Sequence, residues 1–281
     1  MKPGVSEHGP AGEAREHFPP RGPFHHPDPW IMPLEPAASP PPQRGPWPDQ
    51  PLDILVVGTH PDDAEIGLGG SIARWIAQQY RVGILDLTSG EPTPLGTPER
   101  RRAETQKANH ALGNPWRINL GLPNRNLEPT LIHRRVVAEA LRRARPRIVF
   151  APFERDAHPD HVAASLLVQA ARFWAKLTKS DLDGEPLPPP RLLFYFSLHL
   201  RAPEPAQLAL DISSHLDVKL QALQAYRSQL VDNQPHGQPT VIERVLTRDR
   251  YWGHLIGVHA AEPIASAELL GLASLHDLTL S

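Results

Sequence analysis

Residues 53–70, DILVVGTHPDDAEIGLGG, decide how the rest of the chain is interpreted. The stretch opens with an apolar run rich in β-branched residues, 53–58, which predicts a buried strand. Apolar residues then recur at helical spacing across 64–79, which predicts a helix. The turn between them carries His60, a proline and two adjacent carboxylates. A strand, a polar turn and a helix in this order are typical of the unit from which parallel α/β sheets are built.

The same alternation continues downstream. Further strands are predicted at 82–87, 117–120, 147–152, 192–197 and 207–212, and further helices at 98–112, 130–144, 162–177, 213–229 and 241–256. This order predicts an α/β fold with a doubly wound, mostly parallel sheet and helices on both faces. The GLGGS segment, 67–71, lies inside the first helix and lacks the spacing of a dinucleotide-binding loop. We therefore expect its glycines to allow close packing of the backbone, or to leave room for a substrate.

Composition changes sharply near residue 53. Residues 1–51 hold 15 of the 34 prolines of this 281-residue chain and show no hydrophobic periodicity. Such a segment buries too little apolar surface to offset the entropy of ordering it. We therefore expect a disordered, proline-rich tail over 1–52 and one folded domain over 53–281, which is an ordinary size for a single α/β domain.

Charge and composition exclude several classes of function. The formal net charge of −2 provides no electrostatic footprint for nucleic acid or for an anionic membrane. The chain has no cysteine, so disulfides and thiol nucleophiles are excluded. It also lacks the run of about 18 apolar residues that a transmembrane helix needs, and it lacks the apolar core of a signal peptide. We expect a soluble, cytoplasmic protein.

The tripeptide His-Pro-Asp occurs three times, beginning at His26, His60 and His158. His60 follows the strand at 53–58, and His158 follows the strand at 147–152. Both therefore lie at the carboxyl end of a strand, where open α/β sheets bind their ligands. His26 lies in the proline-rich tail with no strand before it, so we interpret that copy as a coincidence.

The two remaining copies offer a metal site. His60 and Asp63 stand three residues apart across a turn that proline stiffens, so they can converge on one metal ion. HPDH, 158–161, supplies two imidazoles at the same spacing, and one carboxylate with two imidazoles makes a catalytic zinc site with an open position for water. The structural alternative is that Asp62 or Asp63, and likewise Asp160, simply cap the helices that follow.

These motifs resemble a known family. THPDDAEIGLGG paired with DAHPDH, with TSGE between them, resembles the LmbE-like (PIG-L) N-deacetylase superfamily, over nearly all of residues 53–277. Longer strings such as LTSGEPTPLGTPERRRAE, LGLPNRNL and ALDISSHLDVKLQALQAYRSQ resemble the branch that makes bacillithiol. The resemblance implies a Rossmann-like, LmbE-type domain. It also implies a zinc-dependent amidohydrolase, with ferrous iron as the alternative metal, that removes the acetyl group of N-acetylglucosaminyl malate.

The resemblance also implies roles for single residues. The metal ligands would be His60, Asp63 and His161. Asp62 would be the general base that takes a proton from the attacking water. His158 would stabilise the oxyanion or protonate the leaving amine, and Asp160 would hold the His158 ring. Residue chemistry agrees, because a carboxylate beside a cation stays ionised and an imidazole transfers protons near neutral pH. No GxSxG motif is present to suggest a serine hydrolase.

Substrate contacts are implied at four positions. Arg101 in GTPERR matches an arginine of the family that grips the substrate, while Glu91 in TSGE and Asn124-Arg125 in LPNRN fall at strand ends where the sugar would lie. The chain departs from the family pattern twice. Ala157 replaces an arginine that some relatives carry, and Asn124 stands where close relatives often have aspartate. Both departures bear on the identity of the substrate.

Three alternatives stay open at this point. The chemistry would be the same with N-acetylglucosaminyl inositol or another N-acetyl sugar as substrate. Two histidines and a carboxylate also describe the facial triad of non-haem iron oxygenases. The third alternative is a sugar-binding protein that has kept the fold without catalysis. Because relatives often form homo-oligomers, we expect a homo-oligomer here as well.

Overall fold

The computed structural model describes Met1 and residues 46–271, apart from residues 233, 235 and 236. Most of the predicted tail therefore lies outside the described residues, and its division from the domain remains a prediction. Trp47, near the start of the described segment 46–271, already packs on the domain, because the centroids of its ring and the Trp116 ring lie 5.7 Å apart. Within the described residues, no helix has both the length and the apolar character needed to cross a bilayer.

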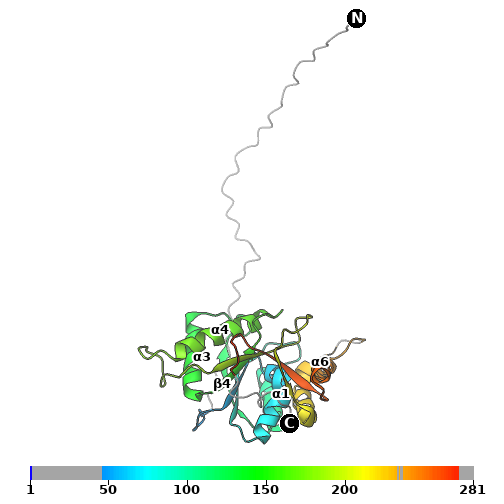
Figure 1. Cartoon of the computed structure of the whole chain (residues 1–281), viewed down its shortest axis with the longest axis horizontal. Helices are drawn as coiled ribbons and strands as arrows, with labels where there is room; N and C mark the ends of the chain where they lie inside the picture. The colour runs from blue at the N-terminus through cyan, green and yellow to red at the C-terminus, as the bar shows by residue number, and fades with distance from the viewer. Residues whose placement is uncertain (2–45, 233, 235–236, 272–281) are drawn as a thin grey trace. The chain divides into compact units, whose positions relative to one another are not determined.

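Seven strands form one sheet in the order β3-β2-β1-β4-β5-β7-β6. Strand β4, Ile148–Pro152, lies inside this sheet and is labelled in Figure 1. Their bounds are β1 Ile54–Gly58, β2 Val82–Thr88, β3 Trp116–Leu122, β4 Ile148–Pro152, β5 Arg191–Tyr195, β6 Leu208–Asp211 and β7 Ala261–Ala265. The five strands from β3 to β5 are parallel, whereas β7 pairs antiparallel with both β5 and β6. The predicted α/β fold with a mostly parallel sheet is confirmed.

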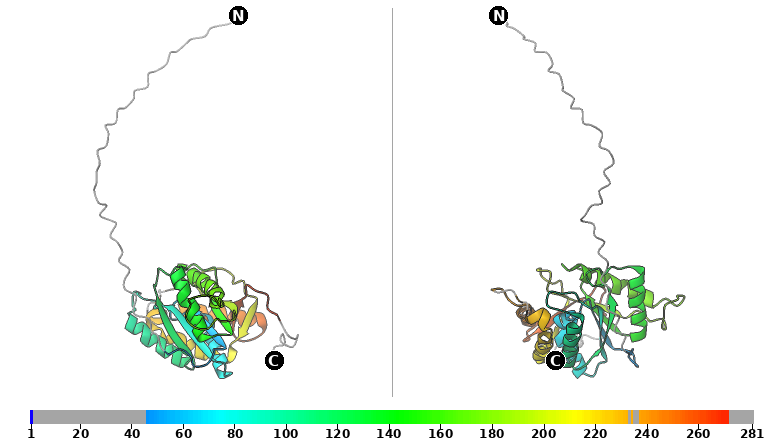
Figure 2. Two further views of the ribbon diagram at one scale, coloured as in Figure 1. Left: turned by 90° about the vertical axis from the view of Figure 1, so that its left-hand side faces the viewer. Right: turned by 180° about the vertical axis from the view of Figure 1, so that it is seen from behind.

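Helices cover both faces of the sheet, as the two further views show (Figure 2). Their bounds are α1 Asp63–Ala77, α2 Pro98–Ala111, α3 Leu131–Ala144, α4 Pro159–Ala175, α5 Leu216–Ala225 and α6 Val241–Ile256. Leu55 and Val57 of β1 pack with α3 and α4 on one face, while Ile54 and Val56 pack with the remaining helices on the other. Successive residues of a strand point to opposite faces, so a strand covered on both sides is apolar throughout. This is why DILVVG has no polar alternation.

The glycines of the GLGGS segment bring α1 close to its neighbours, as expected. A Cβ on Gly67 would lie 2.2 Å from the ring of Tyr195, and one on Gly70 would lie 2.7 Å from Ile212. The amide nitrogens of Gly70 and Ser71 donate to the carboxylate of Glu262 on β7, at 2.9 and 2.8 Å. The glycines therefore serve helix packing and not a nucleotide.

A buried ion network continues from Glu262 toward the C-terminal helices. Lys219 of α5 places its Nζ 2.6 Å from Glu262 Oε1 and 2.7 Å from Asp249 Oδ2. All three side chains are fully buried. Buried charges of this kind are tolerated only when they are paired and hydrogen-bonded. The network therefore ties α1, α5, α6 and β7 together.

Three sequence expectations differ from the structure. Strand β7 is absent from the expected strands, because a glutamate and a proline in AEPIA argue against a central strand. The charge of Glu262 is balanced by Lys219, which is distant in the sequence. The predicted helix at 213–229 is divided into a 3₁₀ turn, Ser213–His215, then α5, then a π-helical turn, Arg227–Val231. The predicted helix at 162–177 begins earlier, at Pro159, so the HPDH motif forms its first turn.

Candidate active site

The two His-Pro-Asp turns meet at the point where the strand order reverses. Strand β1 lies between β2 and β4, and the chain visits β2 and β3 on one side before it crosses to β4 on the other. The loops that leave the carboxyl ends of β1 and β4 therefore diverge and open a crevice, which is where open α/β sheets bind ligands. His60 follows β1 and His158 follows β4, and their ring centroids lie 4.8 Å apart. The copy at His26 lies outside the described residues.

The three predicted metal ligands, His60, Asp63 and His161, converge in this crevice. Asp63 Oδ2 lies 3.4 Å from His60 Nδ1 and 3.3 Å from His161 Nε2. One ligand atom from each of these residues falls within 4.8 Å of the other two, and all three belong to a group that could hold a metal ion. His161 Nε2 is buried, and it has no hydrogen-bond partner among the described residues. A buried imidazole nitrogen aimed at a carboxylate oxygen fits a shared cation, since two imidazoles and one carboxylate are a usual donor set for Zn²⁺.

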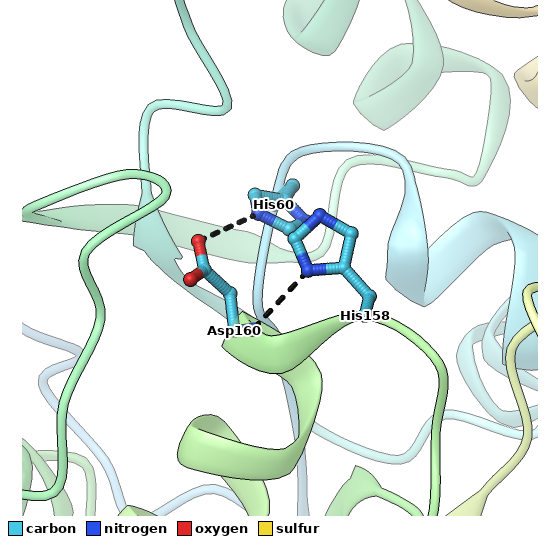
Figure 3. A group of neighbouring side chains, drawn as sticks. All are labelled: His60, His158 and Asp160. Carbon is cyan, nitrogen blue, oxygen red and sulfur yellow. Dashed lines mark hydrogen bonds and ion pairs between the residues drawn. The ribbon is translucent and has the colours of Figure 1, made fainter. Parts of the chain in front are cut away.

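Each of the two imidazoles is held by a second carboxylate on its far side. His161 Nδ1 lies 3.0 Å from Asp156 Oδ2, and His60 Nε2 lies 3.5 Å from Asp160 Oδ2 (Figure 3). Such carboxylates fix the tautomer and the orientation of metal-binding imidazoles. Sequence reasoning gave Asp156 no role, although it stands in the DAHPDH motif two residues before His158.

The electrostatics of the crevice favour positive charge. Burial alone lowers the pKa of an imidazole, but hydrogen bonds to Asp160 and Asp63 raise the pKa of His60 to about 9. For His161, attraction to Asp63 and Asp156 likewise outweighs burial and raises the pKa to about 10. Burial raises the pKa of Asp63, yet the two imidazoles hold it well below its usual value. A site that attracts protons this strongly attracts metal cations for the same reason.

A second group of possible ligands shares His60. It consists of His60, His158 and Asp160. His158 Nδ1 already accepts a hydrogen bond from the Asp160 main-chain nitrogen at 3.2 Å, and Asp160 already holds His60. Because these atoms have partners, whereas His161 Nε2 has none among the described residues, we favour the first group as the metal centre.

Asp62 is held in a strained conformation beside the predicted ligands. Its φ is 121°, a region that residues other than glycine rarely adopt, and strain of this kind persists where the surroundings enforce it, often at functional sites. It stands at the N-cap position of α1 but makes no capping hydrogen bond with its side chain. The carboxylate instead accepts from Arg101 Nη1 at 2.9 Å. Capping therefore does not explain this residue.

Burial also changes the acidity of the Asp62 carboxyl. It raises the pKa of the carboxyl to about 7, although Arg101 opposes the shift. A carboxylate with a pKa near neutral can both accept and return a proton at physiological pH.

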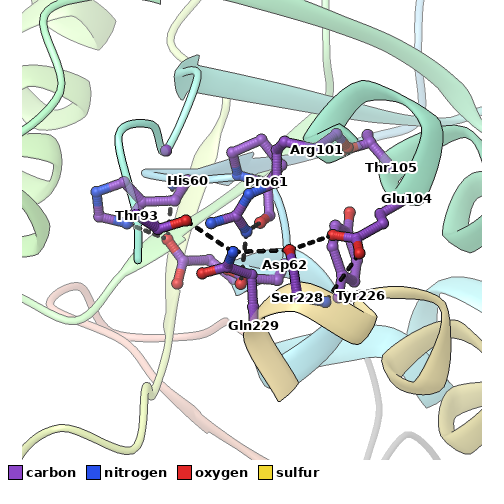
Figure 4. A network of polar contacts seen from close by, with 12 residues as sticks. His60, Pro61, Asp62, Thr93, Arg101, Glu104, Thr105, Tyr226, Ser228 and Gln229 are labelled. Carbon is purple, nitrogen blue, oxygen red and sulfur yellow. Dashed lines mark hydrogen bonds and ion pairs between the residues drawn. The ribbon is translucent and has the colours of Figure 1, made fainter. Parts of the chain in front are cut away.

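Arg101 and Glu91 lie where the motifs suggested, but their side chains are turned inward. Arg101 is only 4% exposed, and its Nε donates to Glu91 Oε1 at 3.1 Å. Its Nη1 donates to Pro61 O at 2.7 Å as well as to Asp62, and Figure 4 shows this guanidinium beside the hydrogen-bonded chain of Gln229, Ser228 and Glu104. These bonds take three of the five N–H donors, and among the described residues Nη2 makes no hydrogen bond, so the expected contact with substrate remains a prediction. The bond to Asp62 also supports a positioning role for Arg101 toward that carboxylate.

His158 is the N-cap of α4, and its Nδ1 accepts from the Asp160 nitrogen. Because Nδ1 is an acceptor, the neutral ring carries its proton on Nε2. Burial and the nearby imidazoles of His161 and His60 lower the pKa of His158 to about 4. One detail differs from expectation: it is the main chain of Asp160, not its carboxylate, that holds the His158 ring.

Of the residues predicted to contact the sugar, Arg101, Asn124 and Arg125 border a cavity beside these groups, whereas Glu91 does not. A cavity of about 350 Å³ is bordered by His60, Asp62, Asp63 and His158 and also by Asn124 and Arg125. The sequence analysis missed several bordering residues, among them His199, Gln229 and Arg244. Gln229 stands in the AYRSQ string, but no local pattern marks His199 or Arg244, which long-range folding brings to the site. The His199 ring lies 5.0 Å from that of His161, centroid to centroid.

Comparison with known proteins matches this region. A family model described as PIG-L, GlcNAc-PI de-N-acetylase, matches residues 55–172, a span that runs from β1 to α4 and contains both His-Pro-Asp turns. Diacetylchitobiose deacetylase of Thermococcus kodakarensis is 28% identical over 198 residues, which cover 64% of this chain and 71% of that protein. The 1D-myo-inositol 2-acetamido-2-deoxy-alpha-D-glucopyranoside deacetylase 2 of Catenulispora acidiphila is 26% identical over 246 residues, which cover 64% and 81%.

A solved structure gives a stronger likeness. The crystal structure of the conserved protein TT1542 from Thermus thermophilus is 44% identical in sequence, with a TM-score of 0.72. The match covers 79% of this chain and 98% of that one, so it includes nearly the whole described domain.

Proposed function

The chain belongs to the LmbE-like (PIG-L) superfamily of N-deacetylases, and from this membership we propose that it hydrolyses the acetamide of an N-acetylglucosaminyl conjugate. The observation that carries the proposal is the placement of a strained, largely buried Asp62 next to three side chains that could together hold a metal ion. That arrangement combines a base with the donor set of a hydrolytic metal centre.

His60, Asp63 and His161 would hold the metal, which we propose to be Zn²⁺, with Fe²⁺ as the alternative. When bound, such an ion polarises the amide carbonyl and acidifies a water molecule. Three protein ligands leave a coordination position open, as catalytic sites require.

The side chains of this protein supply the proton transfers. Asp62 takes a proton from the attacking water and, once protonated, returns it to the departing nitrogen, because its carboxylate is held beside the proposed ligands and borders the cavity. His158 donates from Nε2 to the oxygen that becomes negative as the carbonyl is attacked. The guanidinium of Arg101 donates a hydrogen bond to the Asp62 carboxylate and so holds it in place.

For the substrate we propose N-acetylglucosaminyl malate, in the biosynthesis of bacillithiol. The relatives named above act, by their descriptions, on diacetylchitobiose and on an acetamido-glucopyranoside of inositol. These names support an N-acetylglucosamine unit in the substrate. The malate aglycone rests on the strings that resemble the bacillithiol branch, and N-acetylglucosaminyl inositol is the alternative.

Two other functions are less well supported. A sugar-binding protein without catalysis has no use for a strained Asp62 paired with Arg101, because neither is needed to bind a sugar. The facial triad of iron oxygenases uses similar ligands. Asp62 and His158 suit hydrolysis, however, since they place a base and a donor beside the ligand set.

The test is a free-amine assay on the purified protein combined with metal analysis. The panel contains N-acetylglucosaminyl malate, N-acetylglucosaminyl inositol and diacetylchitobiose. Release of amine that follows the metal content and stops on chelation is the expected result. A protein that binds metal but releases no amine from any member of the panel would refute the proposal.

A further inference from the structure

The active-site cavity contains two arginines whose charge is not balanced by a carboxylate. Arg101, Arg125 and Arg244 all border the cavity. Arg101 is neutralised by its buried ion pairs with Asp62 and Glu91. Within residues 46–271, neither Arg125 nor Arg244 forms an ion pair, which sets them apart from Arg101.

Each of these two guanidinium groups is anchored by one nitrogen. Arg125 Nη2 donates to Pro92 O at 2.6 Å, and Arg244 Nη2 donates to Leu198 O at 2.5 Å. Among the described residues no other side-chain hydrogen bond is made by either arginine, so Nε and Nη1 remain available. A guanidinium fixed at one corner presents its remaining donors in a defined direction, which lowers the entropy lost when a ligand binds.

The two arginines reach the cavity from elements far apart in the sequence. Arg125 lies in the loop after β3, where its main-chain nitrogen donates to Asp160 Oδ2 at 2.7 Å and its φ is 64°. Arg244 lies in the first turns of α6. The loop after β3 is therefore tied to the carboxylate that also holds His60, which fixes Arg125 relative to the proposed metal centre.

The remaining wall of the cavity mixes neutral polar side chains with apolar ones, and the apolar residues are Ile66, Pro92, Leu198, Leu230 and Val241. Thr93, Asn124, Ser197 and Gln229 border it, and the carboxylates that border it, Asp62 and Asp63, are those of the catalytic group itself. Away from the proposed metal centre the cavity therefore offers cationic and neutral donors. Such a surface favours an anion over a neutral polyol, because a guanidinium left without a counter-ion is best satisfied by a carboxylate bound through two nitrogens.

We propose that Arg125 and Arg244 form an anion subsite that binds a carboxylate on the aglycone of the substrate and so selects acidic N-acetylglucosaminides over neutral ones. The inference rests on the proposed deacetylase function, and it adds Arg244 to the residues that determine specificity. Ala157, beside His158, contributes no charge of its own, so the subsite depends on these two side chains.

The experiment compares two substrates that differ only in charge. These are N-acetylglucosaminyl malate and its dimethyl ester, which keeps the same acetamide and the same skeleton. Steady-state kcat/KM is measured for the full-length, zinc-loaded protein and for Arg125→Gln, Arg244→Gln and Arg244→Lys. As a control, Arg250→Gln removes an exposed charge from the same helix without touching the cavity.

We expect the unaltered protein to prefer the diacid. Loss of one charge-assisted hydrogen bond should lower kcat/KM on the diacid by about 10- to 100-fold in either glutamine variant, mainly through KM. The diester should change little, Arg244→Lys should recover part of the loss, and Arg250→Gln should behave like the parent protein.

Two results would overturn the subsite. One is a parent protein with equal kcat/KM on diacid and diester. The other is an equal loss on both substrates in the glutamine variants, which would mean that Arg125 and Arg244 only hold the loops at Pro92 and Leu198. In both cases deacetylation itself persists, so the proposed function would stand. Absence of amine release from both substrates in the parent protein would instead count against the proposed function.

Discussion

Asp156 and His161 form a hydrogen-bonded pair in which the carboxylate Oδ2 lies 3.0 Å from ring Nδ1 and leaves Nε2 directed at Asp63. The same carboxylate accepts from the hydroxyl of Ser197. Burial raises the pKa of Asp156, but the interactions with His161 and Ser197 outweigh it and lower the pKa to about 2. A permanently ionised Asp156 therefore fixes which nitrogen of His161 can face a metal.

The first prediction follows from this pair. Asp156→Ala should weaken zinc binding by about 10- to 100-fold, because the ring of His161 loses its orienting acceptor. Zinc affinity measured by competition with a chromogenic chelator is the direct readout. At saturating zinc the variant should regain much of its activity. Unchanged affinity would show that Asp156 does not orient His161 for the metal.

Asp62 and Asp63 are neighbours with the same side chain, yet substitutions at the two positions should have different effects. Asp63→Ala removes a proposed ligand, so the purified protein should be metal-poor and inactive. Asp62→Asn preserves shape and leaves all three proposed ligands, so metal should remain near one equivalent while kcat falls by roughly 10²–10⁴-fold. Metal analysis and kcat on both variants decide the matter. Equal metal loss in the two variants, or full activity in Asp62→Asn, would contradict the roles.

The burial of Arg101 changes what its removal should do. A residue that only gripped substrate would affect KM alone. Arg101→Ala should instead lower kcat and also reduce the free energy of unfolding by about 3–5 kcal/mol, because Asp62 and Glu91 would be left buried without their partner. Urea denaturation gives the stability and steady-state assays give the kcat. A stable variant with raised KM and normal kcat would restore the role of substrate contact.

The buried lysine in α5 provides a control remote from the chemistry. Lys219→Met should destabilise the protein by about 3–5 kcal/mol, since Asp249 and Glu262 would lose their shared counter-charge. The midpoint of urea unfolding measures the effect. The folded fraction should still bind zinc with the affinity of the parent protein. A midpoint that does not move would show that the ion network contributes no net stability.

Metal loading should depend steeply on pH. Below about pH 9 the imidazoles of His60 and His161 both carry a second ring proton, and so a positive charge, in the metal-free site. The reason is that both pKa values are raised above that of free histidine. Zinc must displace these protons, so the apparent affinity should rise with pH, by up to about tenfold per displaced proton for each pH unit. Competition titrations between pH 6 and 8 test this. A flat profile would mean that the two imidazoles do not bind the metal.

The sequence by itself determined the fold class and the location of the chemistry. Alternation of apolar strands with amphipathic helices is a local property, and it predicted the parallel core of the sheet from β1 to β5. The rule that ligands lie at the carboxyl ends of strands then brought HPDD and HPDH to one crevice. Both inferences depend on neighbours in the chain, because periodicity and turn chemistry are set within a few residues.

Only the tertiary structure decided how the site is completed. It directs the side chain of Arg101 toward Asp62, and it pairs Asp160 with His60 and Asp156 with His161. It also brings Gln229, His199 and Arg244 to the cavity. It also placed β7 in the sheet, where Glu262 is tolerated because Lys219 lies beside it. Each of these contacts joins side chains from different elements, and several join residues far apart in the chain. Pairing of charges at that range depends on the packing of whole helices against the sheet, which no local pattern in the sequence records.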